Sequence, residues 1–180
     1  VGNENPLAYL GFDDEILDVG LTPNRNDCMA AWSMALETGA ILHKEVSLPY
    51  VEGSANTGDK SRLIVQSETE KCPLFLGKVI NSVTIKPSPK WMRELLMAAG
   101  MKSINNVVDI SNIVMLETGQ PLHFYDIDAI PAQEITVKDQ QHFDYTALDG
   151  ETYHILEDDI VITTEGKPIG IAGIMGGDDS

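Results

Sequence analysis

The stretch SPKWMRELLMAAGMKSINNVVDISNIVMLETGQPLHFYD, residues 88–126, decides the fold. It opens with three helix signals. Ser88 suits an N-cap, Pro89 suits the first helical position, and Gly100 suits the position after the last turn. One face of this segment is apolar at helical spacing, formed by Trp91, Met92, Leu95, Leu96 and Ala99. The first half therefore predicts an amphipathic helix that packs against a partner.

The second half predicts another helix and then a rigid turn. The helix is expected over DISNIVMLETG, residues 109–119, with Asp109 as its N-cap and Gly119 as its end. The turn GQPLHFYD follows, in which Gly119 can take a positive φ and Pro121 fixes φ at roughly −65°. These two residues present the lone imidazole of His123 from a rigid backbone.

Strand-like segments flank the two helices. CPLFLGKVINSVTI predicts a strand over 74–85, and EITVKD, residues 134–139, alternates between apolar and polar residues. ALDGETYHI, residues 147–155, predicts a hairpin with a type I′ turn at Asp149–Gly150, and a second hairpin is expected around Glu165–Gly166. A strand, two helices and then several strands predict an α+β fold.

The N-terminal third predicts a separate small element. Residues 13–45 indicate a polar turn and then a helix, with Asp27 as its N-cap and Gly39 as a point where it ends or loosens. PYVEGSANTGDKS, just after it, has the composition of an exposed linker. The expected division is a segment over 1–48, a linker over 49–70 and a domain over 71–180. The missing initiator methionine suggests a piece of a longer chain.

The charge balance limits the partners of this chain. Its 180 residues carry 12 Lys and Arg against 28 Asp and Glu, a net charge of −16, and the acid is spread along the sequence. Such a surface repels phosphate backbones, so any RNA contact is expected to be local or supplied by another part of a larger protein. No apolar run reaches the ~18 residues of a membrane span, and no signal peptide is recognisable.

Cysteine and histidine usage indicates a cytosolic protein without a metal site. Cys28 and Cys72 lie far apart without CxxC spacing, which favours two reduced thiols, with a disulfide as the alternative. Histidines are scattered and lack zinc-ligand spacing, so no metal is predicted. The sequence also lacks GxSxG and Ser-x-x-Lys, which argues against a hydrolase with a covalent nucleophile.

Two features admit both a structural and a functional interpretation. GIAGIMGG, residues 170–177, matches neither a P-loop nor GxGxxG, and predicts a strand whose backbone closely approaches another strand or a ligand. His123 lies between apolar neighbours, either as a satisfied core or rim residue or as the wall of a pocket. Short polar residues in SINNVVDISN, residues 103–112, either cap the helix or surround a small polar ligand.

Four segments together resemble the β chain of bacterial phenylalanyl-tRNA synthetases in wording, order and spacing. They are LTPNRND at 21–27, the opening stretch at 88–126, LDGETYHI at 148–155 and IGIAGIMGGDDS at 169–180. The first resembles the end of the B1 region, and residues from about 70 onward resemble the B3/B4 region. The resemblance implies a B3/B4-like α+β domain, incomplete at its C-terminus, with helices packed on mixed or antiparallel sheets. A small helical B1-like segment would precede it.

The same resemblance implies a function. In that family the β chain joins an α chain in an (αβ)2 ligase, and the α chain activates phenylalanine with ATP and Mg²⁺. The B3/B4 region hydrolyses tyrosine misattached to tRNA(Phe), whose 3′ end other domains deliver, and it holds no cofactor. The alternative is a non-catalytic module, either a scaffold of the β chain or a stand-alone amino-acid-binding protein.

The resemblance also implies site residues. His123 is the catalytic candidate, for positioning water or contacting the substrate. Ser111 stands where the family commonly has threonine, which preserves a hydroxyl. The implied substrate-binding residues share small size or a neutral polar group: Asn106, Ser111, Pro121, Ala172 and Gly173. The tyrosine-sensing glutamate of the family lies beyond Ser180.

Overall fold

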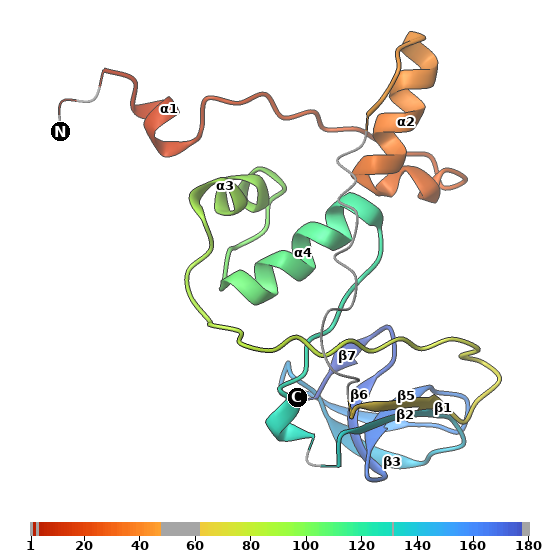
Figure 1. The fold of residues 1–180 in the computed structure, drawn as a ribbon. Helices are drawn as coiled ribbons and strands as arrows, with labels where there is room; N and C mark the ends of the chain where they lie inside the picture. The colour runs from red at the N-terminus through yellow and green to blue at the C-terminus, as the bar shows by residue number, and fades with distance from the viewer. Residues whose placement is uncertain (1, 3, 48–61, 131, 178–180) are drawn as a thin grey trace. The chain divides into compact units, whose positions relative to one another are not determined.

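The structure, a computed structural model, describes residues 2, 4–47, 62–130 and 132–177. Its contacts define two compact units, each built from two pieces of the chain (Figure 1). The helical unit comprises residues 1–52 and 84–122, and the sheet unit comprises residues 53–83 and 123–180. The predicted α+β class is confirmed, because helices and a mixed sheet both form.

The helical unit contains the four α-helices of the described residues. Its elements are α1 (Pro6–Leu10), a 3₁₀ turn η1 (Asn26–Met29), α2 (Ala31–Leu42), α3 (Lys90–Ala98) and α4 (Asn106–Thr118). Both helices predicted within 88–126 are present. The amphipathic face of α3 buries Met92 and Leu96 against Ile113 of α4. Gly100 takes a φ of 76° just after α3, as expected for a residue that ends a helix.

Asp109 does not cap α4, contrary to the prediction. The N-cap is Asn105, whose side-chain oxygen accepts 3.0 Å bonds from the amides of Val107 and Val108. Asp109 lies in the first turn with 0% exposure. The prediction was wrong because an acidic residue in the first turn of a helix looks, in sequence, like an N-cap.

The Asp109 carboxylate instead gathers donors from three segments, which we call the Asp109 cluster. It accepts bonds from the Ser88 hydroxyl, from the Ser103 hydroxyl at 2.5 Å and from the Ile104 amide at 2.9 Å. Burial alone would raise the pKa of Asp109, but these hydrogen bonds outweigh it and lower the pKa. Ser88 is therefore used in this cluster and does not cap α3, whose N-cap Pro89 has no side-chain bond.

The N-terminal helix also begins differently from the prediction. Asp27 does not cap it, because η1 precedes α2, whose N-cap Ala30 makes no side-chain bond. Asp27 pairs instead with Arg25 at 3.1 Å, and Arg25 pairs with Glu37 at 3.0 Å. Gly39 does not end the helix. It lies buried within α2, where an added Cβ would approach the Val46 side chain to 2.2 Å.

The sheet unit holds a five-stranded mixed sheet and a two-stranded hairpin. Their strands are β1 (Ile64–Ser67), β2 (Glu134–Lys138), β3 (Phe143–Thr146), β4 (Thr152–Ile155), β5 (Val161–Thr164), β6 (Lys167–Ile171) and β7 (Met175–Gly176). The large sheet has the order β1-β2-β5-β6-β7, and β3 pairs with β4. The β1–β2 pair is parallel, and the other pairs are antiparallel.

Apolar side chains cover both faces of the large sheet. Val161 and Ile171 pack with Tyr145, Ala147 and Ile155 around the β3–β4 hairpin. The neighbouring residue on β5 faces the opposite way, as the two-residue period of a strand requires. On that opposite face the buried residues are Ile130, Ile135 and Ile162, with Leu63, Phe75, Tyr125, Ile169 and Ala172 packed against them.

The strand predicted over 74–85 is wrong. This segment forms no strand in the described structure, and Leu74 and Leu76 are 71% and 80% exposed. The strand lies earlier, at β1, within the 49–70 segment expected to be a linker, of which residues 49–61 lie outside the described part. β1 takes the place beside β2, and Ser82 at a φ of 60° interrupts the later segment.

The two predicted hairpins differ in their turns. The hairpin predicted around Glu165–Gly166 is present, and the φ values of 48° and 74° at these two residues are those of a type I′ turn. The other connection spans the five residues between Thr146 and Thr152, with a bond from the Gly150 amide to the Ala147 carbonyl. Gly150 has a positive φ but Asp149 does not, so a type I′ turn there was a wrong prediction.

Candidate functional site

The turn that carries His123 starts at the end of α4. Gly119 has a φ of 77°, and its amide donates to the Met115 carbonyl at 2.8 Å, as predicted for the end of this helix. The Thr118 hydroxyl donates to the Val114 carbonyl at 2.7 Å and accepts from the Gln120 amide at 3.1 Å. The backbone that leads to Pro121 and His123 is therefore held by side-chain bonds as well as by its glycine and proline.

His123 lies against Tyr125 in the sheet unit. Their ring centroids are 4.5 Å apart at an interplanar angle of 62°, an edge-to-face arrangement. His123 remains exposed to solvent, yet nearby protein atoms remove enough water from around the ring to lower its pKa. The imidazole is therefore neutral at pH 7, a form that carries both a hydrogen-bond donor and an acceptor.

The glycine-rich segment at the end of β6 lies beside Tyr125. A Cβ added to Gly170 would lie 3.4 Å from the Tyr125 hydroxyl oxygen, and Ala172 packs on the same apolar cluster as Tyr125. Burial and the nearby Tyr145 raise the pKa of Tyr125 to about 12, so its hydroxyl keeps its proton. We call His123, Tyr125, Gly170, Ala172 and Gly173 the His123 face.

The turn in the His123 face is short and well defined. The Ala172 amide donates to the Ile160 carbonyl at 2.9 Å, and the Ile174 amide donates to the Ile171 carbonyl at 3.1 Å. Gly173 takes a φ of 71° and is exposed, so its backbone is open to solvent. The close approach predicted for GIAGIMGG is made to another strand, because Gly170 pairs with Gly176 and a Cβ added to Gly170 would lie 3.7 Å from the Gly176 Cα.

The predicted site residues divide between the two units. His123, Ala172 and Gly173 belong to the sheet unit, where Tyr125 contacts His123 and packs on the same apolar cluster as Ala172. The others, Asn106, Ser111 and Pro121, belong to the helical unit. The Ser111 hydroxyl donates to the Val108 carbonyl of its own helix at 2.7 Å. The Asn106 side chain accepts from the Lys86 amide at 3.0 Å and donates to the Thr84 carbonyl at 3.1 Å.

Sequence reasoning did not single out Tyr125. The available signal was its position two residues after His123 in an extended segment, where alternate side chains point the same way. Asp126, the nearest carboxylate in sequence to His123, has another role. Its side chain accepts a 3.0 Å bond from the Asp128 amide and caps the 3₁₀ turn η2 (Ile127–Ala129).

The described residues contain no group of three or more His, Cys, Asp and Glu side chains that could hold a metal ion. Both cysteines are free thiols, with Cys28 buried and Cys72 half-buried. Among the helices of the described ranges, none is long and apolar enough to cross a membrane.

Comparison with known proteins defines the class of this domain. The sequence profile of the B3/4 domain family matches residues 71–180, more than half of the chain, so this chain belongs to the B3/4 domain family. The profile includes every residue of the His123 face.

The most informative relatives are phenylalanine–tRNA ligase beta subunits. The chain is 38% identical over 179 residues to that subunit of Streptococcus pneumoniae serotype 4, which covers 98% of this chain. It is 39% identical over 181 residues to the subunit of Streptococcus thermophilus and 40% identical over 185 residues to that of Bacillus cereus. The chain spans only about 22% of the length of these relatives. It is thus similar to about a fifth of such a subunit.

Proposed function

We propose that this chain is the editing region of a phenylalanine–tRNA ligase β subunit, which hydrolyses tyrosine misattached to tRNA(Phe). The observation that carries the proposal is the His123 face, where a neutral imidazole lies against Tyr125, whose hydroxyl approaches Gly170 in the glycine-rich segment. Membership of the B3/4 family and similarity to phenylalanine–tRNA ligase beta subunits support the choice of substrate.

The need for such a site follows from pocket chemistry. A pocket for phenylalanine cannot strongly reject tyrosine, which only adds a hydroxyl, and achieves a discrimination of about 10²-fold. A second site that hydrogen-bonds this hydroxyl selects tyrosine, because phenylalanine would leave buried polar groups unpaired. Ala172 and Gly173 are proposed to form the floor of the editing site.

The proposed reaction needs no covalent nucleophile. Water adds to the ester carbonyl carbon, the carbonyl oxygen takes the negative charge, and the intermediate collapses to release tyrosine. The ribose oxygen of the terminal nucleotide leaves and takes up the proton that the attacking water gave up. A neutral His123 ring can accept a hydrogen bond from the attacking water or contact the substrate, so its role is orientation of the reactants.

The rest of the ligase would supply the other functions. The α chain would partner this β chain in an (αβ)2 assembly and activate phenylalanine with ATP and Mg²⁺. Other domains would hold tRNA(Phe) and deliver its 3′ end. This segment would hold no cofactor, and the assembly would work in the cytoplasm.

His123→Ala in the complete ligase tests the proposal. We expect hydrolysis of tyrosyl-tRNA(Phe) to slow by about 10- to 100-fold, the effect of losing one orienting group. Phenylalanine activation, measured by pyrophosphate exchange, should stay unchanged. His142→Ala is the matched control, since His142 is exposed and outside the His123 face. Unchanged deacylation in His123→Ala would remove His123 from the mechanism.

A non-catalytic module is the second candidate. It is favoured by the bonds that Asn106 and Ser111 already make within the helical unit, which can be purely structural. Calorimetric titration of the complete ligase and of its Ala172→Leu variant with tyrosine separates the two. An editing pocket loses one tyrosine site in Ala172→Leu, whereas a scaffold gives identical titrations.

A further inference from the structure

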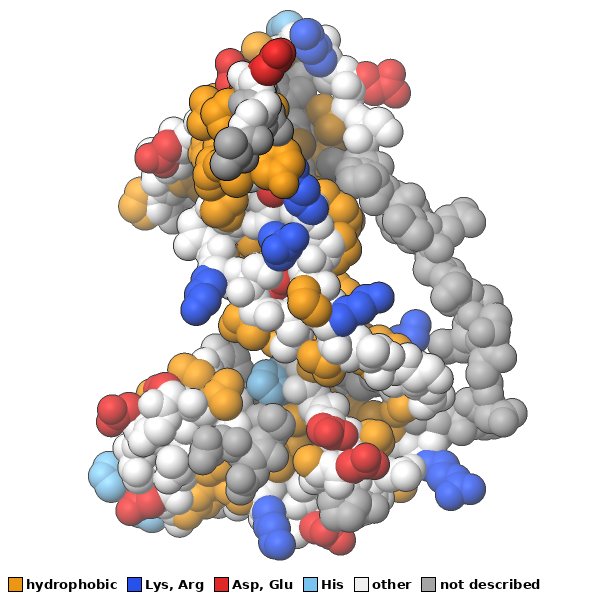
Figure 2. All heavy atoms as spheres, turned by 90° about the vertical axis from the view of Figure 1, so that its left-hand side faces the viewer, with side chains coloured by type: hydrophobic (Ala, Val, Ile, Leu, Met, Phe, Trp, Pro, Cys, Tyr) orange, Lys and Arg blue, Asp and Glu red, His pale blue; other side chains and the backbone are white. Residues whose placement is uncertain are grey.

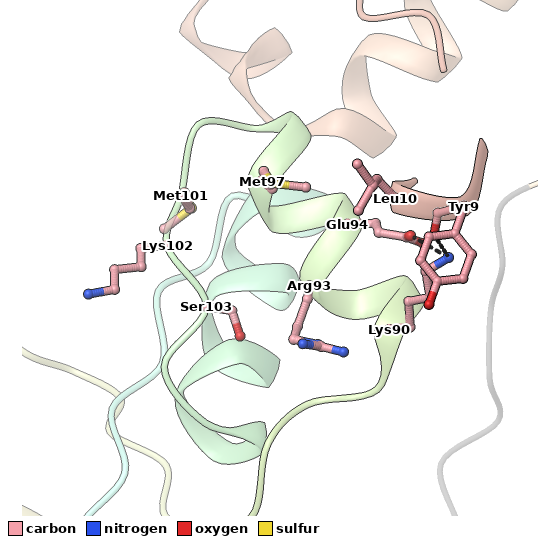
Figure 3. A pocket seen from close by; sticks show the side chains of 9 residues that line it. All are labelled: Tyr9, Leu10, Lys90, Arg93, Glu94, Met97, Met101, Lys102 and Ser103. Atoms are coloured by element: carbon pink, nitrogen blue, oxygen red, sulfur yellow. Dashed lines mark hydrogen bonds and ion pairs between the residues drawn. The ribbon is translucent and has the colours of Figure 1, made fainter. Parts of the chain in front are cut away.

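The helical unit carries a hollow that the His123 face does not include. It has a volume of about 610 Å³ and is lined from α1, from α3 and from the segment after α3 (Figure 3). Its lining residues are Tyr9, Leu10, Lys90, Arg93, Glu94, Met97, Met101, Lys102 and Ser103. We call this feature the α3 hollow.

The α3 hollow is positively charged, whereas the chain as a whole is negatively charged. Three cations, Lys90, Arg93 and Lys102, line it together with a single carboxylate, Glu94, although the whole chain has a net charge of −16. Figure 2 shows Lys and Arg side chains gathered on the face of the helical unit that carries α3. A local positive site on an acidic protein indicates an anionic partner. The surrounding acidic surface repels such a partner, so it would bind only at the positive site.

Two of these cations are available to a ligand. Lys90 is occupied, since its ammonium lies 3.1 Å from the Glu94 carboxylate and donates to the Tyr9 carbonyl at 2.9 Å. Arg93 and Lys102 are exposed, and no carboxylate among the described residues pairs with either of them. Exposed cations without internal partners keep their hydrogen-bond donors for a bound anion.

Apolar and aromatic groups stand beside the cations. Tyr9 is 67% exposed, and the Lys90 ammonium lies 6.0 Å from the centroid of its ring. Met97 and Met101 add apolar surface to the same hollow. Cations that track a backbone, next to an exposed aromatic ring, are the combination that binds single-stranded nucleic acid, because bases stack on the ring while phosphates meet the cations.

We propose that the α3 hollow binds the phosphate backbone of a single-stranded RNA segment, with Arg93 and Lys102 on phosphates and Tyr9 under a base. Such a site would let this chain contact RNA locally, although its net charge of −16 repels RNA elsewhere on the surface. An acidic peptide would meet the same cations but would leave the exposed ring of Tyr9 without a stacking partner. The contact does not depend on the hydrolysis proposed for His123, because it involves no ester.

Neutralisation of the two available cations tests the inference. The probe is a fluorescent 12-nucleotide single-stranded RNA, titrated with the full chain by anisotropy at several salt concentrations. Each phosphate contact on a single strand changes the slope of log K against log salt by about 0.7. Arg93→Gln/Lys102→Gln should therefore make the slope shallower by about 1.4 and weaken binding about 25-fold at 0.1 M salt. Glu94→Gln should strengthen binding.

Lys44→Gln/Lys167→Gln is the matched control, since both lysines are exposed and lie outside the hollow. It removes the same charge and should leave the slope unchanged. Equal losses in the two double variants would show a non-specific charge effect and overturn the inference. The inference is also overturned if Arg93→Gln/Lys102→Gln binds RNA like the parent chain, or if the hollow binds a polyglutamate peptide and not RNA.

Discussion

The Asp109 cluster predicts a strong and specific dependence of stability on one carboxylate. Asp109 is 0% exposed and accepts bonds from Ser88, Ser103 and Ile104, which tie the start of α3 and the α3–α4 connection to the first turn of α4. Its Oδ2 accepts hydrogen bonds from both serine hydroxyls, and its Oδ1 accepts one from the Ile104 amide. Substitution of this residue should therefore loosen the helical unit.

The magnitude follows from the bonds that are lost. A hydrogen bond to a charged group contributes about 1.5–3 kcal/mol, and an unsatisfied buried donor costs about 1–3 kcal/mol. Asp109→Asn can keep the bond from Ile104 but loses the charged acceptor of both serines, so we expect a loss of about 2 kcal/mol. Asp109→Ala leaves all three donors without an acceptor and should cost about 4 kcal/mol.

Urea denaturation followed by tryptophan fluorescence measures these losses. Trp32 and Trp91 both belong to the helical unit, so the signal reports on the unit that contains Asp109. Asp18→Asn is the matched control, since Asp18 is exposed, and it should change stability by less than about 0.5 kcal/mol. A loss in Asp109→Asn no larger than in this control would refute the structural role of the cluster.

The pH dependence provides a second check on the same residue. The hydrogen bonds lower the folded-state pKa of Asp109 below its ordinary value of 3.8. A carboxyl with a depressed pKa contributes stability that is present above the unfolded pKa and is lost as pH falls through the folded pKa. The difference between the parent chain and Asp109→Asn should therefore be full at pH 7 and shrink below about pH 4. A constant difference from pH 7 to pH 2 would contradict this assignment.

Two further predictions concern the turn after α4 and its histidine. Gly119→Ala should destabilise the helical unit by about 1 kcal/mol in urea denaturation, because its φ of 77° disfavours a side chain and the added Cβ would lie 3.3 Å from that of Ala30. Gly20→Ala, whose Cβ would meet no atom within 4 Å, should be neutral in the same assay. The rate at which the complete ligase deacylates tyrosyl-tRNA(Phe) should decrease as the pH is lowered below 6.5. The pKa of His123 is lowered, so its ring becomes charged only in that range. An acid limb above pH 6.5 would exclude His123 as the titrating group.

Local signals predicted those parts of the fold that depend on single residues. The glycines after α3 and α4 end both helices, and the Glu165–Gly166 pair forms the hairpin turn, because positive φ values favour particular residues. The predictions failed where a partner is distant. Asp109 meets Ser88 across 21 residues, and no local pattern reveals that contact. The four residues of β1 are too few to stand out, whereas the longer apolar run after them looks like a strand.

The candidate site shows the same division. Gly119 and Pro121 indicated a rigid turn at His123 from their backbone preferences alone. The approach of Tyr125 to Gly170 joins residues 45 positions apart, so only the fold reveals it. The family resemblance selected Ala172 and Gly173, while the contacts of the helical unit show that Asn106 also holds the backbone at Lys86.

The parallel pairing of β1 with β2 has a consequence for the order of folding. Between Ser67 and Glu134 the chain runs through 66 residues, which include α3 and α4, before the edge of the sheet can form. Loop-closure entropy grows with the length of flexible chain, by about 0.6 kcal/mol for each doubling. If α3 and α4 fold first around Leu96 and Ile113, the flexible length falls by about half, and β1 joins β2 about threefold faster. During synthesis α3 and α4 emerge before β2, so the helical pair can fold before the sheet. Slow folding of α3 and α4 would leave β1 as an unpaired strand that is prone to aggregation.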